Sequence, residues 1–150
     1  MSDDFFGALD GKIADLNKAQ DARAERRGAD QAFSERAILA MRPVADRYVA
    51  QLRERGIYAI VGGNERGLTI EMRWADGADH GLAVYPELES GRLKIFRNST
   101  DHRDDRRFRS SDGATYDEAS WKASFFEEAL KGVINDFMAQ AAKHGGITAP

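Results

Sequence analysis

The stretch that most constrains the fold of this chain is the seven-residue run Leu68–Trp74. Apolar and polar residues alternate through the whole run. A period of two is typical of a β-strand with one buried face, because an α-helix would scatter the apolar side chains around its circumference. We therefore expect one face of the strand to carry Leu68, Ile70, Met72 and Trp74 toward a core, and the other to carry Thr69, Glu71 and Arg73.

Three more strands are predicted close to this one. Ile57–Val61 precedes it, and Leu82–Tyr85 and Arg92–Phe96 follow it. The links between them are short and rich in residues that favour chain reversal, namely Gly62–Gly67, Ala75–Gly81 and Ser90–Gly91. Since a parallel crossover needs a dozen or more residues, neighbouring strands must be antiparallel. Residues 57–97 are thus predicted to form a four-stranded meander.

Helices are predicted before the meander. Residues 29–56 carry one apolar face made of Phe33, Ala37, Met41, Val44, Tyr48 and Leu52. Pro43 lies inside this helix and is expected to kink it. Residues 1–28 are predicted to be an N-terminal helical arm, with Gly28 as the favoured break before the helix that follows. Three alternatives are open for Lys18–Gln31: a frayed helix, a linker, or part of one long arm continuous with the next helix.

A last helix is predicted over residues 115–145. Thr115–Glu118 has the spacing of a capping box, and an apolar face follows with Trp121, Phe125, Ala129, Val133 and Phe137. Residues 98–114 are expected to be a charged loop, with a fifth strand at 106–110 as an alternative. Helices that precede and follow an antiparallel sheet in the sequence define a single α+β domain spanning 1–150.

Composition excludes some classes of protein. With 150 residues, of which 42% are hydrophobic, the chain can bury a real core, so global disorder is excluded. The net charge of −3, from 22 basic and 25 acidic residues, argues against a general nucleic-acid binder. The chain has no cysteine, so disulfides and thiolate metal sites are excluded.

Several motifs that carry chemistry elsewhere have a simpler explanation here. The glycines of Gly62–Gly67 lie between two strands, whereas a phosphate-binding loop must lead into a helix. Asp76, Asp79 and His80 share a turn, but their spacing does not match a calcium-binding loop. His102 lies beside Asp101 and Asp104, which suits acid–base chemistry, yet nearby arginines would pair with those carboxylates. We therefore expect no metal, no cofactor and no catalytic site.

Three surfaces are candidate binding sites. The first is the arginine-rich segment, with Arg103, Arg106, Arg107, Phe108 and Arg109. The second is the open face of the sheet at Glu71 and Arg73. The third is a narrow apolar stripe on the N-terminal arm, which we expect to be a dimer contact because one sheet face accepts only about two helices. Its residues are Phe6, Leu9, Ile13 and Leu16.

The sequence carries no motif specific enough to name a family. We interpret the chain as a non-catalytic, homodimeric protein-binding or adaptor module. The alternatives are a ligand-binding or enzymatic domain with a pocket between the sheet and the last helix, and nucleic-acid binding through residues 97–109. The acidic N-terminus and the lack of a long apolar run predict a cytoplasmic protein without a membrane span.

Overall fold

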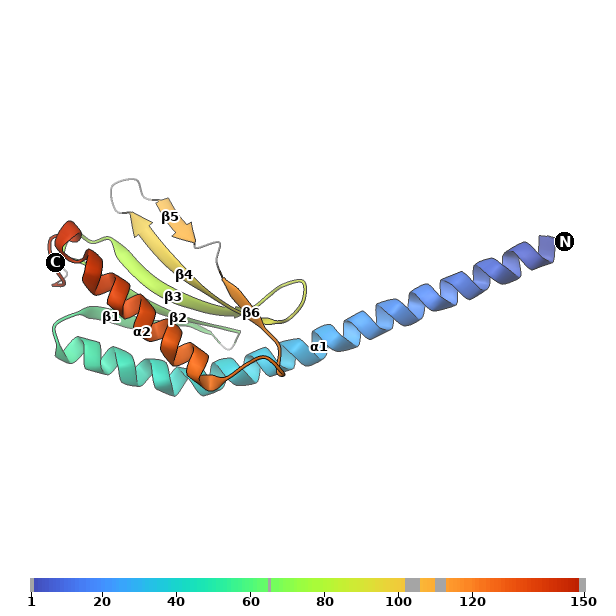
Figure 1. Ribbon diagram of the computed structural model, residues 1–150, viewed down its shortest axis with the longest axis horizontal. Coiled ribbons are helices and arrows are strands. Elements are labelled where there is room, and N and C mark those ends of the chain that lie inside the picture. The colour runs from blue at the N-terminus through green and yellow to red at the C-terminus, as the bar shows by residue number, and fades with distance from the viewer. Residues whose placement is uncertain (1, 65, 102–105, 110–112, 149–150) are drawn as a thin grey trace.

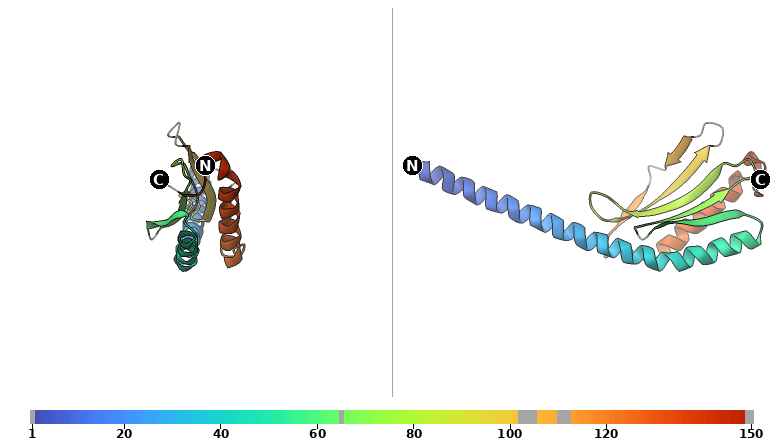
Figure 2. Two further views of the ribbon diagram at one scale, coloured as in Figure 1. Left: turned by 90° about the vertical axis from the view of Figure 1, so that its left-hand side faces the viewer. Right: turned by 180° about the vertical axis from the view of Figure 1, so that it is seen from behind.

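The computed structural model describes residues 2–64, 66–101, 106–109 and 113–148. A curved antiparallel sheet is covered on one face by the second half of the first helix and by the last long helix, while the first half of the first helix projects away from the body (Figures 1 and 2). The fold is α+β, as predicted. Its elements are α1 (Ser2–Glu54), β1 (Tyr58–Asn64), β2 (Gly67–Arg73), β3 (Asp79–Pro86), β4 (Leu93–Asp101), β5 (Arg106–Arg109), β6 (Ala114–Tyr116), α2 (Ala123–Gln140) and a short 3-10 helix (Ala142–His144).

The sheet confirms the predicted meander and adds to it. Strands β1 to β5 pair in sequence order, and every pair is antiparallel. The alternative of a fifth strand is confirmed as β5. The sixth strand, β6, was not predicted; it pairs with the first half of β4, where Leu93 lies opposite Tyr116. Both β5 and β6 therefore lie along one strand, at opposite ends of it.

The predicted register of β2 is confirmed by burial. Ile70 is 1% exposed and Trp74 is 2% exposed, whereas Thr69, on the other face of the strand, is only half-buried. Ile70 lies opposite Leu82 of β3, so the buried row continues across the sheet. The indole nitrogen of Trp74 donates a hydrogen bond to the backbone oxygen of Phe137 in α2 at 2.9 Å, and the two rings stack with centroids 5.0 Å apart.

The second half of α1 supplies much of the remaining core. Its buried residues follow the predicted face, from Phe33 through Met41 to Leu52. On α2 the buried residues are Phe126, Leu130, Val133 and Phe137. Both sets belong to one hydrophobic cluster with the inner face of the sheet.

The predicted break at Gly28 is wrong. Helix α1 runs without interruption from Ser2 to Glu54, through both Gly28 and Pro43. One glycine inside a helix costs only about 1 kcal/mol relative to alanine. The surrounding residues Ala24–Arg27 and Ala29 are mostly strong helix formers, so the helix continues.

The predicted start of the last helix is also wrong, because Thr115 is part of β6 and α2 begins at Ala123. Bonds of the capping-box kind form two residues later than predicted, in the turn before α2, and the N-cap residue of α2 itself, Lys122, makes no side-chain cap hydrogen bond. The Asp117 carboxylate accepts a bond from the Ser120 amide at 2.9 Å, and the Ser120 hydroxyl accepts one from the Asp117 amide at 3.0 Å. Pairing of β6 with β4 takes Thr115 out of the helix.

Candidate functional site

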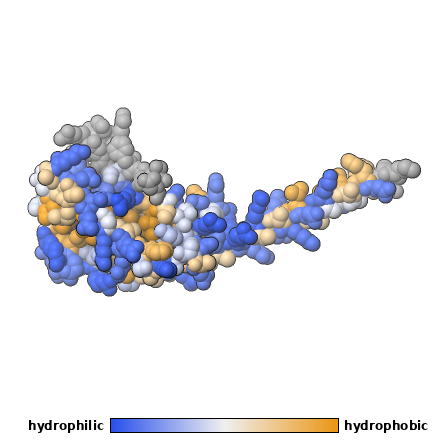
Figure 3. All heavy atoms as spheres, in the orientation of Figure 1, coloured by the Kyte–Doolittle hydropathy of each residue, from blue (hydrophilic) through white to orange (hydrophobic). Residues whose placement is uncertain are grey.

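The first half of α1 is an exposed helix that contacts the other described residues of its chain only at its base. Every residue from Asp4 to Ala29 is exposed, a length of about 40 Å at 1.5 Å per residue. The predicted stripe lies here, with exposed fractions of 57% for Phe6, 38% for Leu9, 46% for Ile13 and 63% for Leu16. Figure 3 shows apolar spheres along this projection, separated by hydrophilic ones. We call residues 4–29 the arm.

The arm leaves the body in a fixed direction, because the turn between β3 and β4 holds its base. The Arg27 guanidinium donates to the Leu88 carbonyl at 2.7 Å. The buried Ser34 hydroxyl donates to the Gly91 carbonyl at 2.7 Å. Gly91 has φ +75°, and a Cβ there would lie 2.6 Å from the Arg27 carbonyl oxygen. Only glycine allows this close approach of turn and helix.

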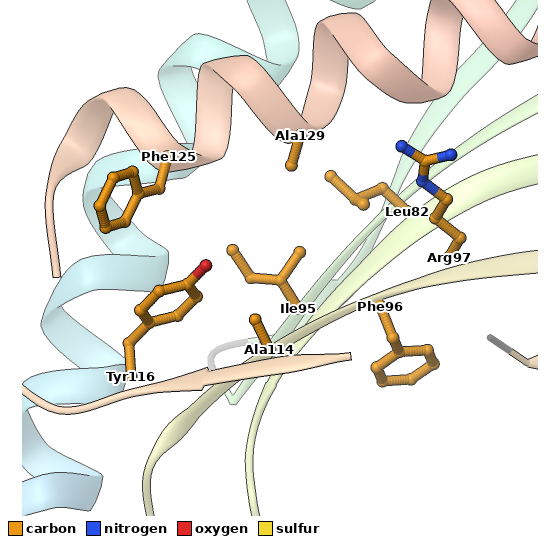
Figure 4. Close-up of a pocket in the computed structure, with 8 residues that line it drawn as sticks. All are labelled: Leu82, Ile95, Phe96, Arg97, Ala114, Tyr116, Phe125 and Ala129. Atoms are coloured by element: carbon orange, nitrogen blue, oxygen red, sulfur yellow. The ribbon is translucent and has the colours of Figure 1, made fainter. Parts of the chain in front are cut away.

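A second site is a pocket of about 360 Å³ between α2 and the edge of the sheet at β4 and β6 (Figure 4). Leu82 and Ile95 form its floor, and Ala129 faces them from α2. The Tyr116 side chain points into the space from β6. The Phe96 ring points away from the space, so Phe96 lines the pocket from its position on β4 and not with its ring. The pocket lies where the alternative interpretation of the sequence expected one.

The two ends of the pocket differ in chemistry. At one end the Tyr116 ring contacts Trp121 and Phe125, with centroids 5.2 and 5.4 Å apart. At the other end Arg97 reaches up from β4 and forms an ion pair with Asp136 of α2. The pocket therefore runs from an aromatic cluster to a pair of opposite charges.

The room in the pocket comes from small residues on one stripe of α2. Phe125, Ala129, Gly132 and Asp136 follow one another at helical spacing on the side facing β4. A Cβ on Gly132 would lie 3.0 Å from an Arg97 guanidinium nitrogen, so the missing side chain leaves room for Arg97. Ala129 leaves the space above Ile95 unfilled.

The open sheet face at Glu71 and Arg73 is held by interactions within the chain. The Arg73 guanidinium lies 4.7 Å from the centre of the Tyr58 ring and 3.5 Å from the Glu71 carboxylate. Burial, followed by a hydrogen bond with Asp79, raises the pKa of Glu71. Glu71 and Asp79 line a smaller hollow of about 130 Å³. Whether a partner binds this face stays a prediction.

The arginine-rich segment is described only in part. Arg106, Arg107, Phe108 and Arg109 form β5, with Phe108 opposite Ser99 of β4. Arg103, like His102 and Asp104, lies outside the described residues. Nucleic-acid binding by this segment stays a prediction.

The residues of the Asp76–His80 turn have separate partners. The Asp76 carboxylate lies 2.7 Å from Nδ1 of His144, whose ring stacks on Trp74. The Asp79 side chain shares a hydrogen bond with the Glu71 carboxyl group. Among the residues that the structure describes, no group of three or more His, Asp or Glu side chains could hold a metal ion.

His80 belongs to β3 rather than to the turn, and it is 6% exposed. Its Nδ1 lies 2.8 Å from the Ser99 hydroxyl. Burial is the main cause that lowers the pKa of His80. Its Nε2 atom is buried and has no hydrogen-bond partner among the described residues.

No family model, no curated protein and no solved structure matches this chain. Neither helix of the part that the structure describes has the length and apolar character to cross a bilayer.

Sequence reasoning missed Tyr116, which lines the pocket, and the ion pair of Arg97 with Asp136 at one end of it. One signal was present. The stripe that begins at Phe125 continues with Ala129 and Gly132, and two small residues in succession on an apolar stripe indicate unfilled space against the opposing sheet.

Proposed function

We propose that this protein is a non-catalytic binding module that associates with a second copy of itself through its arm. The observation that carries the proposal is the stripe of four exposed apolar residues, against which none of the residues that the structure describes is packed. Most helical stability in proteins comes from tertiary packing, which the exposed stripe lacks, and Gly7 and Gly11 weaken this part of the helix further. A second arm supplies that packing.

The spacing of the stripe suits a two-stranded coiled coil. Phe6, Leu9, Ile13 and Leu16 are separated by three, four and three residues, which is the a/d pattern of two heptads. The seam then becomes polar at Gln20 and Arg23, so the paired region is short.

Antiparallel pairing fits the shape of the molecule better than parallel pairing. At 3.6 residues per turn, the stripe lies on the same side of α1 as the buried face from Phe33 to Leu52, to within roughly 45°. Two parallel arms facing each other would bring both bodies into the same space. In an antiparallel pair Phe6 lies opposite Leu16 of the second copy, and the overlap ends near Gln20, before the contact of Arg27 with the body.

Charge supports the same orientation. With Phe6 opposite Leu16, antiparallel pairing places Asp4 opposite Lys18 and Asp10 opposite Lys12 of the second copy, whereas parallel pairing places each of these carboxylates beside its own copy. The helix dipoles also oppose each other in this arrangement.

The first experiment is sedimentation equilibrium of the full chain, of Ile13→Glu and of Ala14→Glu. The wild type and Ala14→Glu are expected to be dimers, because residue 14 lies outside the seam. Ile13→Glu is expected to be monomeric, since it places a charge in an apolar layer. A monomeric wild type, or a dimer that withstands Ile13→Glu, contradicts the proposal.

The second experiment tests orientation by oxidative cross-linking, which the absence of natural cysteine makes simple. In the antiparallel pair Asp10 lies beside Asp10 of the second copy near the two-fold axis, so Asp10→Cys is expected to cross-link. Phe6→Cys is not, because the two residues would be about 15 Å apart along the axis. The opposite result would show a parallel pair.

A further inference from the structure

The pocket between α2, β4 and β6 has the size and the walls of a small-molecule site. Its volume of about 360 Å³ falls within the range of about 300–1,000 Å³ that is usual for ligand sites. Most of its lining is apolar, with a few polar groups at its ends, which is also usual for such sites. It is independent of the arm, which lies on another part of the molecule (Figure 1).

The aromatic end of the pocket offers a ring-binding surface. Tyr116, Trp121 and Phe125 contact one another at angles between 35° and 84°, which leaves ring edges and faces available to a further ring. The Tyr116 hydroxyl points into the pocket and makes no hydrogen bond with any other described residue. The hydroxyl is therefore available to bond to a ligand that fills the pocket.

The charged end of the pocket determines the charge of the ligand. Arg97 and Asp136 neutralise each other, and the pair presents N–H donors and carboxylate oxygens side by side. Because the pair has no net charge, a charged ligand would have to compete with the existing ion pair for one of its two members. A neutral group with both a donor and an acceptor, such as a carboxamide, can bond to both side chains.

We propose that this pocket binds an uncharged, mainly apolar small molecule that has an aromatic ring and a carboxamide-like polar group. The ring lies between Ile95 and Ala129, against the aromatic cluster, and the polar group lies at Arg97 and Asp136. The space exists because Ala129 and Gly132 are small, and a larger side chain at residue 129 would occupy it.

The test uses naphthalene-2-carboxamide as the probe and the full chain with labelled methyl groups. Binding is followed by NMR shifts of the Leu82, Ile95 and Ala129 methyl groups. Naphthalene-2-carboxylate and 2-naphthylmethylamine have the same ring with a negative or a positive charge. The carboxamide is expected to bind about fivefold or more tightly than either, the effect of about one hydrogen bond. A carboxylate or amine that binds equally well, or no methyl shift at the solubility limit, overturns the proposal.

Matched variants locate the site. Ala129→Leu fills the pocket and is expected to weaken binding at least about tenfold, whereas Ala139→Leu, on the exposed side of α2, leaves it unchanged. Tyr116→Phe removes one oxygen atom and is expected to weaken binding severalfold. Because Tyr116→Phe keeps the aromatic ring and its packing, it keeps the test valid if Ala129→Leu disturbs the fold. Binding that is unchanged in both variants overturns the proposal.

Discussion

The two halves of α1 belong to one continuous helix but are stabilised in different ways. In residues 30–54 the apolar face packs on the sheet, and Ile38 is 1% exposed. In the arm a similar apolar residue, Ile13, is 46% exposed. The comparison teaches that helical periodicity in a sequence predicts a helix and its apolar face, but not whether that face is covered within the same chain.

The largest expected difference comes from making the same substitution, isoleucine to alanine, once in each half. Ile38→Ala should lower the free energy of unfolding of the body by about 2–5 kcal/mol, because it leaves a cavity in the core. Ile13→Ala should change it by less than about 0.5 kcal/mol. Urea unfolding of dilute protein, followed by the fluorescence of Trp74 and Trp121, measures this. Equal losses would show that the arm is part of the cooperative core.

The junction between the two halves is tested at Gly91. Gly91→Ala should cost about 1–3 kcal/mol, because it strains a positive φ and also pushes a Cβ against the Arg27 carbonyl. Gly56→Ala is the matched control, since its φ is +81° but a Cβ there meets no atom within 4 Å. Urea unfolding should show a greater loss for Gly91→Ala. If Gly56→Ala lowers the free energy of unfolding by as much, the contact between Gly91 and the base of the arm contributes nothing to stability.

The arm itself should become more stable on one substitution. Gly11→Ala should stabilise the helix by about 1 kcal/mol, because a Cβ there meets no atom within 4 Å and alanine favours helix. Far-UV circular dichroism during heating should show that the arm helix is lost at a higher temperature. Gly132→Ala in α2 should give no such gain, because its Cβ would meet Arg97. A destabilised Gly11→Ala variant would indicate that a second chain packs against residue 11.

The smallest effect is expected from pH and concerns only the body. Burial lowers the pKa of His80, with Asp136 and Asp79 acting in the opposite direction to Arg97 and His144. The folded protein therefore binds fewer protons than the unfolded chain, so stability falls as pH drops below about 6.5.

Urea unfolding at pH 7.5 and 5.5 should show this loss in the wild type and a smaller one in His80→Gln. Glu71 cannot account for the loss, because its raised pKa favours the folded protein as pH falls. Identical pH dependence in the two proteins would exclude His80 as the cause.

The sequence predicted the fold wherever the pattern was local. Alternation in Leu68–Trp74 and helical spacing in Phe33–Leu52 each identified the buried face correctly. Strand β6 could not be predicted, because three residues carry no periodicity and Ala114–Tyr116 is a strand only through its pairing with β4. The start of α2 was wrong for the same reason.

The candidate sites were predictable to different degrees. The exposed stripe of the arm follows from spacing alone, and its place on a projecting helix follows from the surplus of helices over sheet area. The pocket depends on Arg97 and Asp136 meeting across two elements, and no local pattern indicates such a contact. Ala129 and Gly132 indicated unfilled space, but only the structure shows which strand they face.

The contacts between the β3–β4 turn and α1 have a consequence for the proposed dimer. A helix fixed at its base acts as a rigid spacer rather than a flexible tether. In the antiparallel pair the centre of the overlap lies near residue 11, about 24 Å from the anchored Arg27, so the two bodies are held about 50 Å apart. The proposed dimer would present two identical pockets at a set distance, and a target with two matching groups at that spacing would bind far more tightly than a target with one.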